Sequence, residues 1–182
     1  VNLRRGEYSR PADLMGVPTD STLSGGTELE ELIRSGFYDL TPPESGLPPI
    51  LLGSGIAESM QLFRGDTVQV WAFENLVMTP TGTPVPAIRR FEVTGTFRTG
   101  LYETDTRRVY TPLESAQELL DFGGAVSNVG MRLDEPDEAG RTGAALEARL
   151  GEGYGVDTWI TTNAALFSAL KLEKLAMFLI LF

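Results

Sequence analysis

Two segments that alternate apolar and polar residues constrain the fold of this chain most strongly. Residues 67–73 read TVQVWAF and residues 90–97 read RFEVTGTF. A period of two is typical of a β-strand with one buried face, so each segment predicts a strand. Residues 74–89 between them contain three prolines and are too many for a tight hairpin turn. We therefore expect a sheet with a long loop, whose apolar tip either contacts a partner or folds back onto the body.

Turn and capping signals predict helices in the first two thirds of the chain. Residues 27–36 read TELEELIRSG, which opens with a capping box and closes on a Gly, as expected for a short amphipathic helix. Residues 50–62 predict a strand end that leads into a helix, with Ser54 as the N-cap. Pro112 starts another helix. Two further short strands are expected, at residues 14–17 and 109–111.

The last third of the chain predicts a β-α-β unit. Residues 126–133 are expected to form a strand, residues 137–150 a helix, and residues 156–159 a second strand, with a Gly-rich turn before it. Together with the upstream elements, this order predicts an α+β fold.

The C-terminal segment leaves two interpretations open. A helix is expected from Asn163, and its last residues, 175–182, read LAMFLILF directly after Lys171, Glu173 and Lys174. A membrane-spanning helix needs about 20 apolar residues, more than this run supplies. The run is either a buried C-terminal element or the start of a transmembrane helix with the charged residues at the membrane interface. Residue 1 is Val rather than an initiator Met, so we expect a part of a longer protein.

Composition excludes several classes of function. Asp and Glu number 25 against 15 Lys and Arg, a formal charge of −10, which repels nucleic acid. The chain has no Cys and no His, so disulfides, thiolate or imidazole metal sites and the usual nucleophile–base pairs are absent. We expect no cofactor, no metal and no catalytic residue.

Several motifs could be interpreted as functional sites, and each of them also has a simpler structural explanation. The acidic residues 133–140 lack the Glu that a calcium loop starting at Asp134 would need at Ala145, and helix N-terminal charge explains them better. Residues 53–55 read GSG without the spacing of a nucleophile elbow. Glu103 and Asp105 form a carboxylate pair that a hydrolase could use, although solvated surface acids are the simpler expectation. Five arginines flank the long loop and are expected to pair with surplus carboxylates or to contact a partner: Arg89, Arg90, Arg98, Arg107 and Arg108.

Longer stretches resemble one family of membrane proteins. SALKLEKLAMFLIL at residues 168–181 resembles the start of the second transmembrane helix in lipoprotein-releasing ABC transporter permeases of the LolC/LolE family. PPILLGSGIAESMQLFRGDTVQV, TPTGTPVPAIRRFEVTGTF, YETDTRRVYTPLESAQELL and VGMRLDEPDEA resemble the periplasmic domain of the same family, in the same order. The resemblance covers residues 48–182. Parts of it extend to the wider MacB and FtsX-type permeases.

The resemblance implies a domain layout. Residues 1–26 would be part of a porter subdomain, and residues 27–125 an inserted, mostly-β Sabre subdomain that carries a hook at 74–89. Residues 126–162 would be the β-α-β unit of the porter. Residues 163–182 would be a linker helix and the start of the second transmembrane helix.

The resemblance also implies a location, partners and a binding site. The chain would lie on the periplasmic side of the inner membrane, in a permease that releases lipoproteins and passes them to a periplasmic carrier. A second permease subunit, a cytoplasmic ATPase and the lipoprotein substrate would be the other partners. The hook would bind the carrier through Phe73, Thr79, Pro80, Thr81, Gly82, Pro84, Pro86 and Arg89. Lys171, Glu173 and Lys174 would lie at the membrane interface.

Two alternatives remain. An FtsX-like or MacB-like permease would use the same fold to bind a cell-wall hydrolase or an export adaptor. A hydrolase built on Glu103 and Asp105 is the alternative from another class.

Overall fold

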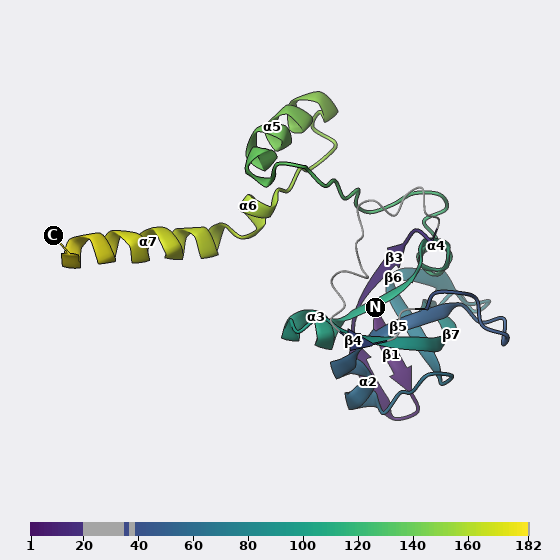
Figure 1. The fold of residues 1–182 in the computed structure, drawn as a ribbon. Coiled ribbons are helices and arrows are strands. Elements are labelled where there is room, and N and C mark those ends of the chain that lie inside the picture. Colours follow the sequence, from purple (N-terminus) through teal and green to yellow (C-terminus); the bar gives the residue numbers. More distant parts are fainter. Residues whose placement is uncertain (20–34, 37–38, 182) are drawn as a thin grey trace. The chain divides into compact units, whose positions relative to one another are not determined.

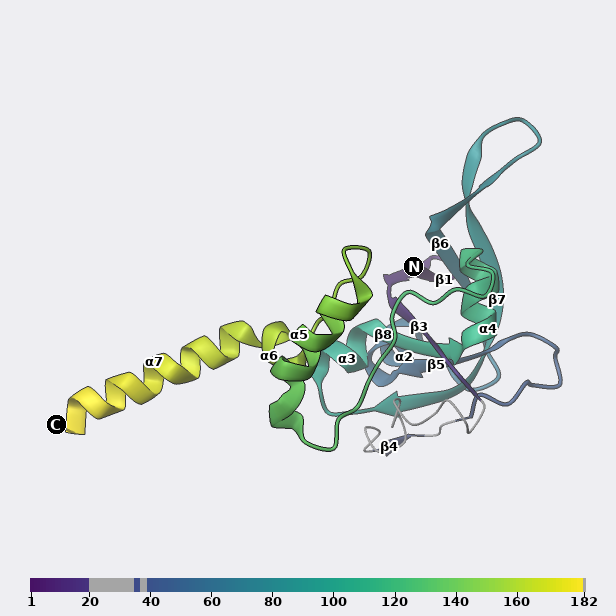
Figure 2. The same cartoon turned by 90° about the horizontal axis from the view of Figure 1, so that it is seen from above.

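The computed structural model describes residues 1–19, 35–36 and 39–181, which form two compact units, Val1–Gly130 and Met131–Phe182. In its described residues the first unit is a curled mixed sheet with three helices, and α2 and α3 lie next to one another at the end of the sheet opposite α4 (Figures 1 and 2). The strands are β1 (Asn2–Arg5), β2 (Tyr8–Pro11), β3 (Asp13–Val17), β4 (Ser35–Gly36), β5 (Pro49–Gly53), β6 (Thr67–Met78), β7 (Pro84–Arg98) and β8 (Arg108–Pro112). The helices are α2 (Ser54–Met60), α3 (Tyr102–Arg107) and α4 (Leu113–Leu120).

The sheet runs in the order β2-β1-β6-β7-β5-β8-β3, and β4 pairs with β7. β6 and β7 are antiparallel, whereas β5 runs parallel to β7 and β3 runs parallel to β8. The α+β class predicted from the sequence is confirmed, as are the strands expected near residues 14–17, 67–73, 90–97 and 109–111.

The core of the first unit lies between the sheet and its helices. Alternate residues of β6, Val68, Val70 and Ala72, are fully buried, as the period of two predicts. The neighbouring strand β7 buries Phe91 in the same cluster. α2 buries Ile56 against the same cluster. Burial of this apolar surface is the main stabilising contribution to the unit.

The prediction of a long loop at residues 74–89 is wrong. β6 continues to Met78 and β7 begins at Pro84, so most of this segment is a two-stranded extension of the sheet. Pro84 and Pro86 are tolerated because, among the described residues, β7 at this end pairs only with β6, so the missing N–H groups interrupt no second ladder.

The N-terminal end of α2 also differs from the prediction. Gly53, not Ser54, is the N-cap residue, and no side chain caps the helix. A Cβ on Gly53 would lie 2.3 Å from the backbone oxygen of Asp105, and a Cβ on Gly55 would lie 2.6 Å from Cγ2 of Thr106. The two glycines of the GSG motif therefore permit α3 to approach the start of α2.

Two boundaries expected upstream need correction. Ser35 and Gly36 pair with β7, so the helix expected over 27–36 does not extend to its predicted end. The remainder of that prediction lies outside the described residues. β1 and β3 belong to the same sheet as β6 and β8, so the described residues show no boundary between a segment 1–26 and a segment 27–125. The porter and Sabre assignments stay predictions.

The second unit is helical. It contains a short 3-10 helix (Pro136–Glu138), α5 (Ala139–Leu150), α6 (Trp159–Thr162) and α7 (Ala164–Leu181). The helix expected over 137–150 is confirmed, but the strands expected at 126–133 and 156–159 are absent from the described residues. A strand needs a neighbouring backbone for its N–H and C=O groups, and neither segment pairs with one here. Of the predicted β-α-β unit, the described residues therefore show only the helix.

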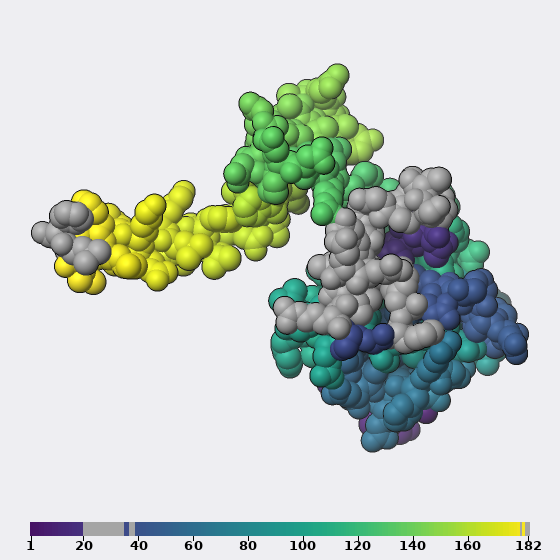
Figure 3. All heavy atoms as spheres, viewed as in Figure 1, coloured from purple at the N-terminus to yellow at the C-terminus, as the bar shows by residue number. Residues whose placement is uncertain are grey.

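The helix expected from Asn163 is present as α7. Its exposed apolar residues include Leu166, Leu172 and Phe178, and Figure 3 shows side chains of this segment projecting on the face in view. Within the described part of the chain, no helix is both long enough and apolar enough to cross a membrane.

Candidate partner-binding arm

Residues 73–89 form an arm that extends the β6–β7 ladder beyond the body of the first unit (Figure 2). The backbone pairs run from Ala72 opposite Ala87 to Leu76 opposite Pro86, and they end with Met78 opposite Pro84. The arm is therefore an ordered two-stranded ribbon rather than an irregular loop.

A compact turn closes the arm at Thr79–Thr83. The backbone N–H of Gly82 donates to the carbonyl of Thr79 at 2.9 Å, and the N–H of Thr79 donates to the carbonyl of Thr83 at 3.0 Å. Gly82 has φ +78°. Pro at the second position, Gly at the fourth and a left-handed Gly are typical of a type I turn followed by a G1 bulge. The backbone N–H of Thr83 also donates to Oγ1 of Thr79 at 3.0 Å, so the side chain of Thr79 supports the turn.

The arm exposes an apolar surface to water, and this exposure does not stabilise a monomer. Met78 is 64% exposed, and the other large apolar side chains in the arm are exposed to a similar degree: Phe73, Leu76, Val77 and Ile88. An apolar surface of this kind, on a protruding element, is typical of a protein–protein contact.

Helix α4 holds the base of the arm. Nδ2 of Asn75, on β6, donates to the backbone oxygen of Leu119 at 2.9 Å. The guanidinium of Arg89, on β7, forms an ion pair with the carboxylate of Glu118 and lies 6.0 Å from the ring centre of Phe91. Both strands of the arm are therefore bonded to adjacent residues of one helix.

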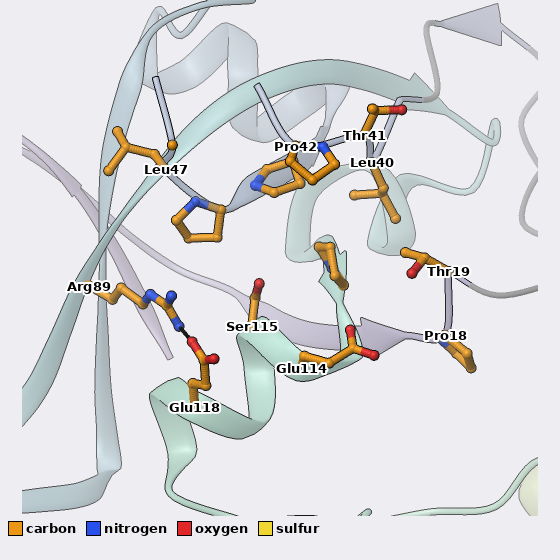
Figure 4. A pocket seen from close by; sticks show the side chains of 14 residues that line it. Pro18, Thr19, Leu40, Thr41, Pro42, Leu47, Arg89, Glu114, Ser115 and Glu118 are labelled. Atoms are coloured by element: carbon orange, nitrogen blue, oxygen red, sulfur yellow. Dashed lines mark hydrogen bonds and ion pairs between the residues drawn. The ribbon is translucent and has the colours of Figure 1, made fainter. Parts of the chain in front are cut away.

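A cavity of about 760 Å³ lies beside this base (Figure 4). Its walls come from the end of β3, the 39–49 segment, β7 and α4, and Figure 4 shows Arg89 and Glu118 pointing toward one another at one end. Pro42 and Leu47 give the opposite wall an apolar character. The cavity is a concave surface next to the arm, lined by both polar and apolar side chains.

All eight residues predicted for partner binding lie on the arm, from its base to its tip. Thr79, Pro80, Thr81 and Gly82 form the turn, Pro84 and Pro86 lie on β7, Phe73 lies where the β6 ladder is interrupted, and Arg89 lies at the base. Their contact with a partner stays a prediction. Lys171, Glu173 and Lys174 are exposed residues of α7 in the second unit, and their position at a membrane interface stays a prediction as well.

Asn75 and Glu118 were not predicted from the sequence as residues of this site. Asn75 sits in a segment that reads as a loop, and Glu118 is one acid among 25. The only sequence signal was the surplus of carboxylates, which predicted partners for the arginines without saying which ones.

Most of the five arginines form ion pairs with acidic residues of the same chain. Besides the Arg89 pair, Arg98 bonds Glu58 at 2.8 Å, and Arg107 lies 3.5 Å from a carboxylate oxygen of Asp13. These contacts favour the ion-pair interpretation for three of the five arginines.

The carboxylate pair does not form a hydrolase site. Glu103 is exposed, whereas Asp105 is only 8% exposed and accepts hydrogen bonds from the backbone of Thr99 and Gly100 and from the Thr99 hydroxyl. The expectation that Asp105 is solvated is therefore wrong. Burial raises its pKa, but the hydrogen bonds from Thr99 and Gly100 and the charge of Arg98 outweigh it and hold the pKa below 3.8. A carboxylate so bonded organises a loop and lacks a free face for catalysis. Among the described residues, no three acidic side chains are grouped closely enough to bind a metal ion.

Comparison with known proteins identifies relatives of the whole chain. The transmembrane protein LolC of the lipoprotein-releasing system of Xylella fastidiosa strain Temecula1 is 33% identical over 180 residues, which cover 98% of this chain and 42% of the relative. LolC of Neisseria meningitidis serogroup B is 35% identical over 147 residues, which cover 80% of this chain and 34% of the relative. The chain thus spans less than half the length of the curated relatives it matches. No family model matches the chain.

Among solved structures, the chain is similar to the extracellular domain of the ABC-type transporter YknZ from Gram-positive bacteria, with 22% identity and a TM-score of 0.49 over 86% of this chain and 75% of that one. The sequence matches to LolC cover 80–98% of the chain at 31–35% identity. The resemblance to the LolC/LolE family of ABC transporter permeases is therefore confirmed, and the chain is homologous to a part of LolC.

Proposed function

We propose that this chain is the periplasmic domain of an ABC transporter permease that releases lipoproteins from the inner membrane, and that its arm binds the periplasmic carrier that receives them. The homology to LolC supports the transporter assignment. The observation that carries the binding assignment is the arm itself, an ordered hairpin with exposed apolar side chains on a closed turn. In this role the chain binds the carrier and transmits motion from the rest of the transporter, and it catalyses no reaction.

The geometry of the arm suits a docking element. Its backbone is already ordered by the β6–β7 ladder and by the turn at Thr79–Thr83, so little conformational entropy is lost on binding. Its apolar residues supply the area that a partner would bury. Arg89 would lie at the edge of that contact, beside Glu118, with which it is paired. The carrier surface that fits is an apolar concavity.

The remaining partners follow from the same family assignment. A second permease subunit and a cytoplasmic ATPase would complete the transporter, and the lipoprotein would be the transported substrate. The domain would face the periplasm from the inner membrane, with α7 leading toward the bilayer. Motion driven by the ATPase would reach the arm as a rigid-body displacement rather than as a chemical step.

Binding of the chain to the periplasmic lipoprotein carrier of its own organism tests the proposal. In one variant residues 78–84 are replaced by Asn-Gly, a two-residue turn that closes the same hairpin between Val77 and Val85 without its tip. In a second, Arg89→Glu reverses the charge at the base and also breaks the ion pair with Glu118. Glu118→Gln breaks the same pair but keeps Arg89, and it is measured beside the second variant. Arg108→Glu, an exposed arginine on β8, is the matched control.

Saturable binding that is lost in the first variant and weakened in the second, but unchanged in the control, is the expected result. Circular dichroism and thermal unfolding should show that each variant is folded. Full binding by the variant without the tip would contradict the site. A folded wild-type chain that does not bind the carrier would overturn the proposed function.

A further inference from the structure

The ladder of the arm is interrupted where it leaves the body. Ala72 pairs with Ala87 and the next pair joins Leu76 to Pro86, so three β6 residues lie between successive pairs while β7 has none. Extra residues on one strand bend and twist a ribbon and break its hydrogen-bond ladder locally. The arm beyond Ala72 is therefore not held in direction by the sheet alone.

Open space lies beside the arm at this point. A groove of about 560 Å³ separates it from the end of α4, with Leu76, Val77 and Ile88 on the arm side and Asp121 on the helix side. Since the arm does not pack tightly against the body here, the few polar contacts across the groove carry most of the restraint.

The hydrogen bond from Asn75 crosses that groove. Leu119 is in the last turn of α4, where backbone carbonyls have no partner within the helix. The amide of Asn75 supplies that partner at 2.9 Å. α4 is itself fixed, because Ala116 and Leu119 are buried against the sheet. The bond thus joins the interrupted part of β6 to a rigid reference point.

The geometry points to Asn75 as a positioning residue: by bonding the C-terminal end of α4, it sets the direction in which the arm projects. Its contribution to carrier binding rests on the proposed function and is indirect, because it orients Met78 and the turn rather than touching the partner. The Arg89–Glu118 pair restrains the other strand in the same way. Without the hydrogen bond of Asn75, the arm would sample more orientations. Only some of these orientations would be competent to bind, which would lower the apparent affinity for the carrier.

Distance measurement between two spin labels tests the restraint directly. The chain has no Cys, so Glu7→Cys and Thr81→Cys label only the β1–β2 turn and the tip of the arm. Asn75→Ala removes the donor, and Asn75→Asp keeps the shape of the side chain but cannot donate to a carbonyl. Asn128→Ala, an exposed Asn of the same unit, is the control.

We expect a narrow distance distribution for the wild type and the control, and a broader or shifted one for both Asn75 variants. Carrier affinity should fall about five-fold in the Asn75 variants, the size of one net hydrogen bond. Thermal unfolding should show that the variants stay folded. An unchanged distribution in Asn75→Ala and Asn75→Asp would overturn the inference.

The binding measurement separates this inference from the proposed function. A broader distribution with unchanged affinity would overturn the role of Asn75 in binding while leaving the carrier assignment intact. Absence of binding by the wild type would overturn the proposed function. The distance distributions would still decide whether Asn75 sets the direction of the arm.

Discussion

Asp105 accepts hydrogen bonds from both the backbone nitrogen and the hydroxyl of Thr99, at 2.7 and 2.8 Å. With the bond from the backbone N–H of Gly100, these contacts fix the 99–101 loop that leads into α3. Because the carboxylate is buried and accepts these three bonds, we expect the loop to depend on its charge.

Asp105→Asn should destabilise the first unit by about 2 kcal/mol at neutral pH, because charge-assisted bonds to a buried carboxylate are replaced by weaker ones. The pKa of Asp105 is lowered in the folded state, so its contribution to stability is present above its ordinary value of 3.8 and is lost as the pH falls through the lower folded value. The difference between wild type and variant should therefore shrink below pH 3.8. Urea unfolding at a series of pH values measures it.

Glu103→Gln is the matched control, because Glu103 is an exposed carboxylate two residues away. It should change the free energy of unfolding little at any pH. A difference for Asp105→Asn that is as large at pH 3 as at pH 7 would mean that the charge of Asp105 is not what stabilises the loop.

Gly53→Ala should be among the most damaging single methyl additions in the first unit. The new Cβ would lie 2.3 Å from the backbone oxygen of Asp105, and neither backbone can move without disturbing β5 or α3. We expect a loss of about 2 kcal/mol or more in chemical denaturation. Gly124→Ala, where a Cβ meets no atom within 4 Å, should be near neutral. Equal effects of the two substitutions would refute the close approach.

Gly82→Ala should loosen the turn of the arm without unfolding the body. At φ +78° a Cβ is strained, which costs about 1 kcal/mol. Amide hydrogen exchange at Thr79 and Thr83 should accelerate about five-fold, while the global unfolding temperature stays the same. Unchanged exchange at both amides would show that the turn does not need a glycine.

Two glycines on α5 should respond in opposite directions. A Cβ on Gly140 meets no atom within 4 Å, so Gly140→Ala should stabilise the helix by up to about 1 kcal/mol. A Cβ on Gly143 would lie 2.7 Å from Cγ2 of Thr158, whose hydroxyl caps α6, so Gly143→Ala should lose helicity in this unit. Circular dichroism of the two variants compares them, and stabilisation by both would contradict this contact.

The sequence predicted the body of the sheet well and its extension badly, for a physical reason. Val68, Val70 and Ala72 alternate because one face of β6 meets the core, and that period is readable without a structure. Beyond Ala72 the arm has no core to face, so FENLVM carries no period although it is still a strand. The turn could have been found from the Pro80–Gly82 spacing, which is typical of the turn that the structure has.

The base of the arm could not be predicted in the same way. The bond between Asn75 and Leu119 joins residues 44 positions apart, and its acceptor is a backbone oxygen that leaves no trace in the identity of residue 119. The unpaired segments 126–133 and 156–159 have strand-like composition, but composition cannot supply the neighbouring backbone that a strand requires.

The parallel pairing of β3 with β8 has a consequence for how the protein is made. Asp13 finds its neighbour only when Arg108 has been synthesised, and Val17 only with Pro112, whereas the β6–β7 hairpin needs no distant residue. Contacts of such sequence separation form late and slow folding. A nascent chain that has not yet passed Pro112 therefore carries the β3 strand without its neighbour. Interrupted synthesis in that interval would leave a backbone edge open to aggregation.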